Sequence, residues 1–268
     1  MGSLVGRRGL KEVVGKRGKV TSEMGEMKKR RYALLMCGED SEYLLKVHGG
    51  TYGIFTKLLE EEDEQWDLYK VVEGNFPDQH NLPLYDGFVI SGSCYDAHAN
   101  DPWILKLLSL VHQLDAMHKK ILGICFGHQI IGRALGGKVG RSPNGWDIGV
   151  KSINVSSSLP LPFSSLNLPS KLSIYKCHRD EILELPPKVE LIASSEMTRV
   201  EMFSYGDHMF CIQGHPEFTH DILLFFIDRV IQRNLVQEAF ALDAKVKAAS
   251  LQPDKDTLRT LCLHFLKG

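Results

Sequence analysis

Residues 121–131 read Ile-Leu-Gly-Ile-Cys-Phe-Gly-His-Gln-Ile-Ile, an apolar run that meets a cysteine with a glycine two positions away on each side. The pattern predicts a short buried strand, a sharp turn at Cys125 and a helix that continues to about Leu135. Gly123 and Gly127 suit this turn because a cramped backbone leaves no room for Cβ atoms beside the cysteine. The thiol is expected at a helix N-terminus, where free N–H groups and the peptide dipole favour a thiolate. The stretch therefore indicates a reactive cysteine, although a free cysteine is more often a small buried hydrophobic residue.

A histidine and a glutamate follow the last predicted strand and supply what a cysteine nucleophile needs. A thiol requires a base, and the base requires a group that orients it. Residues 213–218 read Gln-Gly-His-Pro-Glu-Phe, so His215 and Glu217 are two positions apart with Pro216 between them. In an extended turn the carboxylate can hold one imidazole nitrogen while the other faces the thiol. His128 is a poorer candidate base because it lies in the first turn of the elbow helix, without a carboxylate nearby in the sequence.

Strand and helix patterns alternate through the first half of the chain. Strands are expected at 32–37, at 66–71, at 85–90 and in the elbow run, and a helix at 52–59. Asp101 is the expected N-cap of another helix, with Pro102 in its first turn. The alternation predicts a parallel sheet that is covered by helices on both faces.

The second half changes character and predicts mainly strands, then helices. The expected strands are 146–155, 171–177, 189–193, 200–205 and 208–212, and the expected helices are 219–232, 234–248 and 254–266. We therefore expect one α/β domain over residues 31–245 and a C-terminal helical extension over 246–268. Residues 1–30 are rich in Gly, Lys and Arg and poor in apolar residues, so they are expected to form a disordered basic tail.

The bulk composition excludes several classes of protein. No apolar run approaches the roughly 20 residues of a membrane span. The six cysteines are scattered without a Cys-x-x-Cys pair, which argues against a disulfide framework and against a zinc site. Without a visible secretory signal, a reducing cytosol is the expected compartment. Residues 1–31 carry a net charge of +7 in a chain whose total is −1, so the acidic remainder is not expected to bind nucleic acid.

Together, the Gly-Ile-Cys-Phe-Gly elbow and the His-Pro-Glu motif resemble the class I glutamine amidotransferase family, over roughly residues 46–242. The resemblance implies a three-layer α/β/α fold with a mostly parallel central sheet. Within the family the chain looks most like the plant γ-glutamyl peptidases, free-standing members that cleave the γ-glutamyl bond of glutathione and its conjugates. Further similarity lies in residues 86–93, 177–181 and 261–268.

The resemblance also implies roles for individual residues. Cys125 matches the nucleophile, His215 the base and Glu217 the group that orients the base. The backbone N–H groups of Phe126 and of Gly92 match the oxyanion hole, in which donors meet developing negative charge.

The substrate-binding residues are also implied by the resemblance. Gln129 matches a position that helps to hold the glutamyl group, and His178 and Asp180 match a strand end that lines the same pocket. Between them, Arg179 is either a clamp for a glutamyl carboxylate or a surface ion pair. The chain departs from the family at residues 91–93, where Ser-Gly-Ser replaces the more usual Gly-Gly-Pro of the oxyanion strand.

The sequence thus predicts a cysteine hydrolase that cleaves the γ-glutamyl amide bond of glutathione or its conjugates through a γ-glutamyl thioester, releasing glutamate and a Cys-Gly conjugate. The expected substrate is a small γ-glutamyl peptide, and no metal, cofactor or obligatory protein partner is expected. One alternative is a glutaminase subunit that delivers ammonia to a partner synthetase. The other is a non-catalytic binding protein on an inherited fold.

Overall fold

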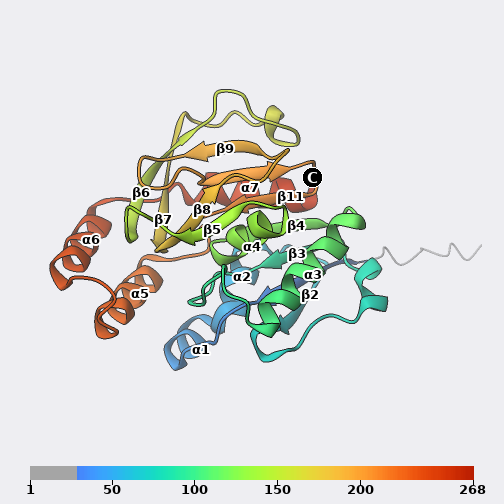
Figure 1. Cartoon of the computed structure of the whole chain (residues 1–268), viewed down its shortest axis with the longest axis horizontal. Coiled ribbons are helices and arrows are strands. Elements are labelled where there is room, and N and C mark those ends of the chain that lie inside the picture. Colours follow the sequence, from blue (N-terminus) through green and yellow to red (C-terminus); the bar gives the residue numbers. More distant parts are fainter. Residues whose placement is uncertain (1–28) are drawn as a thin grey trace, which may run out of the picture.

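The computed structural model describes residues 29–268, which form a nine-stranded central sheet with helices on both sides (Figure 1). Apart from its last two residues, the predicted basic tail lies outside the described residues. The strands of the central sheet are β1 (Arg30–Met36), β2 (Glu64–Lys70), β3 (Gly87–Ile90), β4 (Lys120–Ile124), β6 (Asp147–Val155), β7 (Lys171–His178), β9 (Glu190–Ser194), β10 (Met202–Tyr205) and β11 (Met209–Ile212). The helices are α1 (Glu42–His48), α2 (Gly50–Leu59), α3 (Pro102–Ala116), α4 (Phe126–Ala134), α5 (His220–Gln232), α6 (Glu238–Ser250) and α7 (Lys255–Lys267).

The sheet order is β2-β1-β3-β4-β11-β10-β9-β6-β7. The strands from β2 to β11 run parallel, and the remaining pairs are antiparallel. The predicted three-layer α/β fold is confirmed, and its parallel part is the half that carries the elbow strand β4. Because β11 pairs directly with β4, the segments that follow these two strands emerge side by side at one edge of the sheet.

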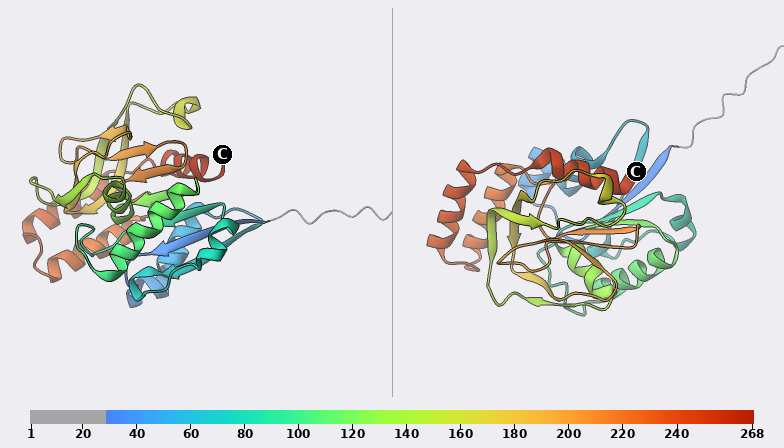
Figure 2. Two further views of the ribbon diagram at one scale, coloured as in Figure 1. Left: turned by 45° about the vertical axis from the view of Figure 1, so that its right-hand side comes forward. Right: turned by 90° about the horizontal axis from the view of Figure 1, so that it is seen from above.

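Alternate side chains of the parallel strands point to opposite faces of the sheet, as expected for extended chains. Ala33 and Leu35 of β1 face the layer of α3 and α4, whereas Tyr32 and Leu34 face the layer of α2 and α7. The views of Figure 2 show these helices on the two sides of the sheet. Both faces are therefore buried, which explains the nearly continuous apolar runs in the sequence.

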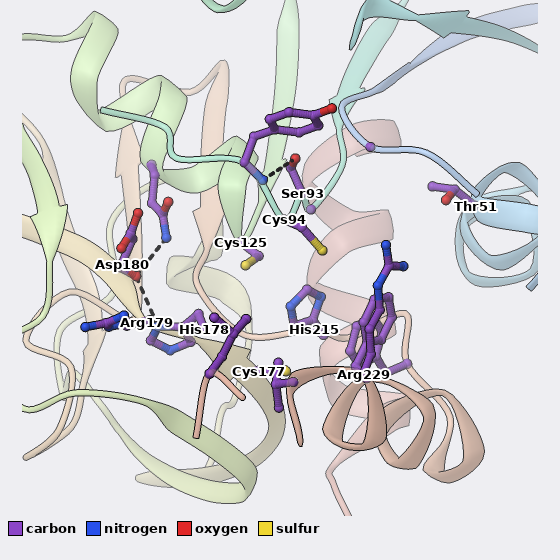
Figure 3. Close-up of a pocket in the computed structure, with 18 of the residues that line it drawn as sticks. Thr51, Ser93, Cys94, Cys125, Cys177, His178, Arg179, Asp180, His215 and Arg229 are labelled. Atoms are coloured by element: carbon purple, nitrogen blue, oxygen red, sulfur yellow. Dashed lines mark hydrogen bonds between the residues drawn. The ribbon is translucent and has the colours of Figure 1, made fainter. Parts of the chain in front are cut away.

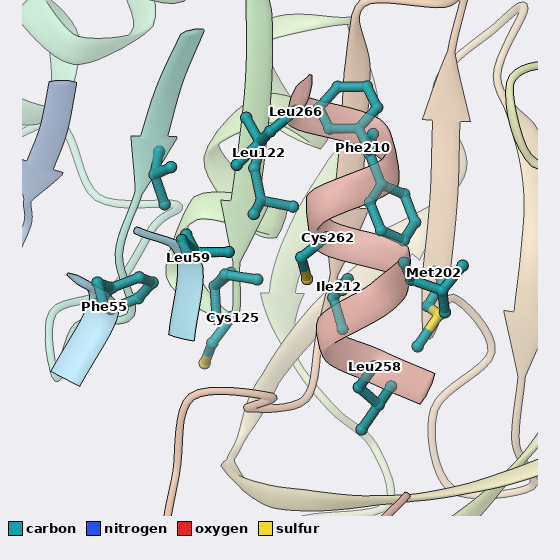
Figure 4. Close-up of a cluster of buried hydrophobic side chains, with 14 of the residues drawn as sticks. Phe55, Leu59, Leu122, Cys125, Met202, Phe210, Ile212, Leu258, Cys262 and Leu266 are labelled. Carbon is teal, nitrogen blue, oxygen red and sulfur yellow. The ribbon is translucent and has the colours of Figure 1, made fainter. Parts of the chain in front are cut away.

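The C-terminal helix α7 is an integral part of the hydrophobic core. Its side chains Leu258, Leu261, Cys262, Phe265 and Leu266 are buried against the sheet and α2 (Figure 4). Helices α5 and α6 pack instead against the antiparallel part of the sheet. The division of the chain near residue 245 stays a prediction, since α7 shares one core with residues from the N-terminal half.

One helix and one pair of strands are not anticipated by the sequence patterns. Helix α1 is only seven residues long, too short to show a helical period, and Ser41 caps it by accepting a hydrogen bond from the N–H of Leu44. Strands β5 (Lys138–Arg141) and β8 (Asp180–Glu184) form a separate antiparallel pair in which Arg141 lies opposite Asp180. This pair brings two charged residues to the edge of the functional site. Among the described residues, no helix is long and apolar enough to cross a membrane.

Candidate active site

The turn between β4 and α4 places Cys125 in a strained conformation. Its φ of 52° and ψ of −100° are outside the regions that a residue with a Cβ ordinarily adopts. A Cβ on Gly123 would lie 2.7 Å from the carbonyl oxygen of Gly127, and a Cβ on Gly127 would overlap the backbone of Ile90. The two glycines therefore permit the close approach of α4 to β3 and β4, and the backbone strain holds the cysteine at the strand-to-helix bend.

The segment after β11 brings the His-Pro-Glu motif to this bend. The N–H of Cys125 donates to the carbonyl oxygen of Ile212, 2.8 Å away, and the N–H of His215 donates to the carbonyl oxygen of Tyr175, also at 2.8 Å. The backbone around His215 is thus tied to β4 on one side and to β7 on the other. Nδ1 of His215 lies 2.7 Å from Oε1 of Glu217, and all three predicted triad side chains are buried.

The protonated form of His215 is favoured strongly. Burial opposes the charged imidazolium, but the Glu217 carboxylate and the Cys125 sulfur outweigh it and raise the pKa of His215 to about 10. Cys125 is thus close enough to the imidazole to contribute to this raised pKa. A protonated imidazole beside a cysteine is the arrangement that stabilises a thiolate nucleophile.

The imidazole of His215 also lies at the end of a stack of two phenylalanine rings. Its imidazole stacks on Phe218 with ring centroids 3.9 Å apart and an interplanar angle of 13°. Phe218 in turn stacks on Phe226 of α5, with centroids 5.1 Å apart. The column restricts rotation of the imidazole and places an aromatic face beside the positive charge, which stabilises an imidazolium.

The predicted oxyanion donors lie next to the reactive groups. A Cβ on Gly92 would lie 3.1 Å from Cε1 of His215 and 3.7 Å from Cβ of Cys125, so the Gly92 backbone borders both side chains. Phe126 is the first residue of α4, where the backbone N–H has no acceptor within the helix. Both residues are therefore placed at the elbow, and their role as donors stays a prediction.

Two serine hydroxyls fasten the Ser-Gly-Ser segment that departs from the family pattern. Oγ of Ser91 accepts from the N–H of Cys37 at 2.9 Å, and Oγ of Ser93 donates to the carbonyl oxygen of Cys37 at 2.7 Å. Gly92 lies between the two anchors, which both attach to the residue that follows β1. Hydroxyl groups thus position the segment that contains Gly92.

We expect Ser91→Ala to lower the free energy of unfolding by about 1–3 kcal/mol, because the buried N–H of Cys37 loses its acceptor. Displacement of Gly92 is also expected to lower kcat while KM changes little, since oxyanion contacts strengthen in the transition state. Urea unfolding and steady-state kinetics measure the two effects. Ser109→Ala, at an exposed hydroxyl on α3, is the control; equal kinetics for wild type and Ser91→Ala would contradict the anchoring role.

The four residues expected to bind substrate line one cavity with Cys125. The Gln129 amide donates to the carbonyl oxygen of Asp180 at 2.8 Å, and Nδ1 of His178 lies 3.1 Å from the same oxygen. The Asp180 carboxylate pairs with Arg141 across β5 and β8. Arg179 is exposed at the cavity edge. The structure brings these residues together on one side of Cys125 (Figure 3), and their contacts with substrate stay predictions.

Two other polar residues near the elbow differ in what they can do. Nε2 of Gln213 lies 3.6 Å from Sγ of Cys125, and its Oε1 accepts from Gln129 at 3.1 Å. Gln213 is thus a contact of the thiol that the motif analysis missed, although it begins the Gln-Gly-His-Pro-Glu segment. His128 is fully buried, and burial lowers its pKa to about 3. Its imidazole is therefore neutral at physiological pH, whereas that of His215 is protonated.

The cavity beside Cys125 has a volume of about 510 Å³, which lies in the range typical of small-molecule sites. It extends from Gln129 and Asp180 on one side to α2 and α5 on the other. Arg229 of α5 lines it, as do Arg141 and Trp146. Arg229 carries no sequence signal of function, because helix periodicity cannot tell which surface residues converge on a distant cysteine.

Comparison with known proteins places the chain in a family. Residues 54–223 match the sequence profile of the family Glutamine amidotransferase class-I. The chain is 49% identical to γ-glutamyl peptidase 3 of Arabidopsis thaliana, over 90% of this chain and 98% of that protein. It is 47% identical to γ-glutamyl peptidase 5 of the same plant, over 89% of this chain and 96% of that protein.

The fold comparison agrees with the sequence comparison. A solved glutamine amidotransferase from Thermotoga maritima superposes with a TM-score of 0.66, over 91% of this chain and all of that one, at 20% identity. At this identity the likeness concerns the fold alone. From its profile match and its relatives, the chain belongs to the class I glutamine amidotransferase family, as its elbow and His-Pro-Glu motif predict.

Proposed function

We propose that the protein hydrolyses the γ-glutamyl amide bond of glutathione and its S-conjugates, with Cys125 as nucleophile, His215 as acid and base, and Glu217 as the orienting carboxylate. The relationship to two proteins named γ-glutamyl peptidase supports an enzyme with hydrolase activity. The observation that carries the proposal is the buried Cys125–His215–Glu217 arrangement at a strained elbow that opens into a cavity.

The proposed reaction has two halves. The Cys125 thiolate attacks the γ-carbonyl carbon, and the oxyanion accepts hydrogen bonds from the N–H groups of Phe126 and Gly92. His215 donates its proton to the leaving amine as the C–N bond breaks, which leaves a γ-glutamyl thioester on Cys125. His215 then takes a proton from a water molecule, and the resulting hydroxide attacks the thioester carbon. The C–S bond breaks, glutamate is released and the thiolate–imidazolium pair is restored.

The size and lining of the cavity support a substrate larger than glutamine. Beyond the polar side chains near Cys125, its wall includes the apolar side chains Leu44, Ile54, Phe55, Phe226 and Val230. Such a wall suits the thioether substituent of a glutathione conjugate, because apolar surface removed from water on binding contributes roughly 25 cal/mol per Å².

The substrate proposal is tested by presenting the purified enzyme alone with glutathione, several S-alkyl and S-aryl conjugates, γ-glutamyl dipeptides and glutamine. Release of glutamate and of the Cys-Gly product is measured by liquid chromatography and mass spectrometry. We expect the conjugates and glutathione to be hydrolysed without a partner protein and to be preferred over glutamine. Glutaminase activity that exceeds peptide hydrolysis, and that rises on adding a synthetase, would instead favour an ammonia-delivering subunit.

The raised pKa of His215 predicts the alkaline limb of the pH–activity profile. The imidazolium must protonate the leaving amine, so kcat/KM is expected to fall only as pH rises through about 10. The stability of the fold is expected to depend on pH in the same direction. The ion pair between His215 and Glu217 contributes fully to the free energy of unfolding below the ordinary histidine pKa of about 6.5. This contribution is lost as pH rises through the raised pKa of His215. In Glu217→Gln the carboxylate that raises the pKa is absent, so the alkaline limb is expected to move to lower pH.

The pH prediction is checked with kcat/KM profiles of wild type and Glu217→Gln in overlapping buffers at constant ionic strength. Glu184→Gln, at an exposed carboxylate that pairs with Lys138, controls for a general change of charge. Coincident alkaline limbs for wild type and Glu217→Gln would contradict the role of Glu217.

We also propose that the protein works in a reducing compartment such as the cytosol. All six cysteines are free thiols in the structure, and the proposed chemistry needs Cys125 reduced. Fractionation of cells that produce the full-length chain tests this proposal.

A further inference from the structure

The cavity continues past His215 on the side away from Gln129 and Asp180. Its far wall is formed by residues of α2 and α5, with Arg229 among them. In Figure 3, His215 lies between Cys125 and Arg229, and the Arg229 guanidinium reaches from α5 into the cavity at the level of the imidazole. Arg229 thus lies on the side of the histidine opposite the thiol. Arg233, the C-cap of α5, also lines the cavity, but its side chain is exposed whereas that of Arg229 is partly buried.

The proposed reaction indicates which half of the substrate lies on each side of the cavity. His215 must protonate the leaving nitrogen, so the leaving peptide has to lie next to the imidazole. The glutamyl half remains attached to Cys125 and is expected beside Gln129 and Asp180. The part of the cavity that reaches toward Arg229 therefore receives the portion of the substrate that departs.

Among the described residues, no acidic side chain forms an ion pair with Arg229. The two acidic residues of its own helix are occupied elsewhere, because Asp228 pairs with Lys245 and Asp221 with His48. Within residues 29–268 Arg229 takes part in none of the ion pairs or side-chain hydrogen bonds, and its side chain is partly buried. In contrast, Arg141 on the glutamyl side is paired with both Asp96 and Asp180.

We propose that Arg229 binds the C-terminal carboxylate of the leaving peptide and so selects γ-glutamyl peptides over glutamine and γ-glutamyl amines. This inference rests on the proposed γ-glutamyl hydrolase function and adds the recognition of the leaving half. A guanidinium binds a carboxylate through two parallel hydrogen bonds, and partial burial strengthens the pair. A leaving dipeptide spans at most roughly 7 Å. We therefore expect its C-terminal carboxylate to lie within reach of a long arginine side chain on the cavity wall.

The test combines substrate and enzyme variants. The substrates are glutathione, glutathione whose C-terminal carboxylate is amidated, and a γ-glutamyl anilide without any leaving-side carboxylate. The enzymes are wild type, Arg229→Gln, Arg229→Lys and Arg233→Gln. The last variant removes the other arginine that lines this part of the cavity, one helical turn further along the chain and at an exposed position, and so tests which of the two binds the carboxylate. Values of KM and kcat are measured for each combination, and circular dichroism checks each fold.

We expect amidation of glutathione to raise KM by about 10- to 100-fold in the wild type, the value of a charge-assisted hydrogen-bonded pair. Arg229→Gln is expected to raise KM for glutathione by a similar factor and to abolish the effect of amidation, while the anilide is hydrolysed as by the wild type. Arg229→Lys is expected to lie between the two, and Arg233→Gln to match the wild type.

The outcomes separate the two proposals. If the wild type hydrolyses glutathione and Arg229→Gln still discriminates against the amidated form, or if Arg233→Gln alone loses discrimination, the assignment to Arg229 is overturned while the proposed function stands. If the wild type cleaves none of the γ-glutamyl compounds, the proposed function is wrong, and the assignment to Arg229 is wrong with it.

Discussion

Cys125→Ala is expected to lower kcat/KM for a γ-glutamyl peptide by at least about 10⁴-fold, because no thioester can form and the remaining groups only bind and polarise the substrate. The fold is expected to survive, since alanine removes one sulfur atom that faces the cavity. The strained φ at this position persists in the variant, so stability is expected to change by less than about 1 kcal/mol. Steady-state kinetics and thermal unfolding measure the two effects.

Cys94→Ala is the matched control for the nucleophile. Cys94 lines the same cavity and is exposed, yet it lies on the loop after β3 and outside the elbow. We expect this variant to retain activity and Cys125→Ala alone to lose labelling by a γ-glutamyl electrophile. A Cys125→Ala protein with wild-type turnover would rule out covalent catalysis at the elbow.

Lys176→Met is expected to lower the free energy of unfolding by about 3–5 kcal/mol. Lys176 of β7 is fully buried, and its ammonium group contacts the carboxylates of Asp147, at 2.8 Å, and Glu201. Burial raises the pKa of Glu201, whereas Lys176 and His178 outweigh burial and lower the pKa of Asp147. Removing the ammonium leaves two buried carboxylates that must be protonated or hydrated, which is the source of the cost.

Thermal unfolding is expected to show a fall in Tm of about 6–20 °C for Lys176→Met. Lys171→Met, at an exposed position of the same strand, is expected to change stability by less than about 0.5 kcal/mol. Combining Lys176→Met with Asp147→Asn and Glu201→Gln should recover part of the loss, because the orphaned charges are removed too. A loss below about 1 kcal/mol in the single variant would show that water or protonation already neutralises the cluster.

Local sequence patterns predicted much of the fold for identifiable reasons. Strands β1, β3 and β4 are buried on both faces, so their apolar runs stand out, and α3 begins at its aspartate–proline signal. Helix α7 shows its helical period but not its place in the core, since period alone does not say which layer a helix joins. Helix α1 was missed because seven residues are too few to show a helical period, and the β5–β8 pair because its strands contain charged residues where an apolar run would be recognised.

The sequence by itself determined the membership of the family and predicted the roles of the elbow residues. A cysteine between two spaced glycines and a His-Pro-Glu segment are both short runs of sequence. They can therefore be recognised without knowledge of the tertiary structure. Only the tertiary structure decided which residues share a cavity with Cys125. Ser91 and Ser93 are fastened to the end of β1, Arg141 meets Asp180 across an unanticipated strand pair, and Arg229 reaches the site from α5. These contacts join residues from distant parts of the chain. They depend on how the layers pack against each other, which the periodicity of a single helix or strand does not reveal.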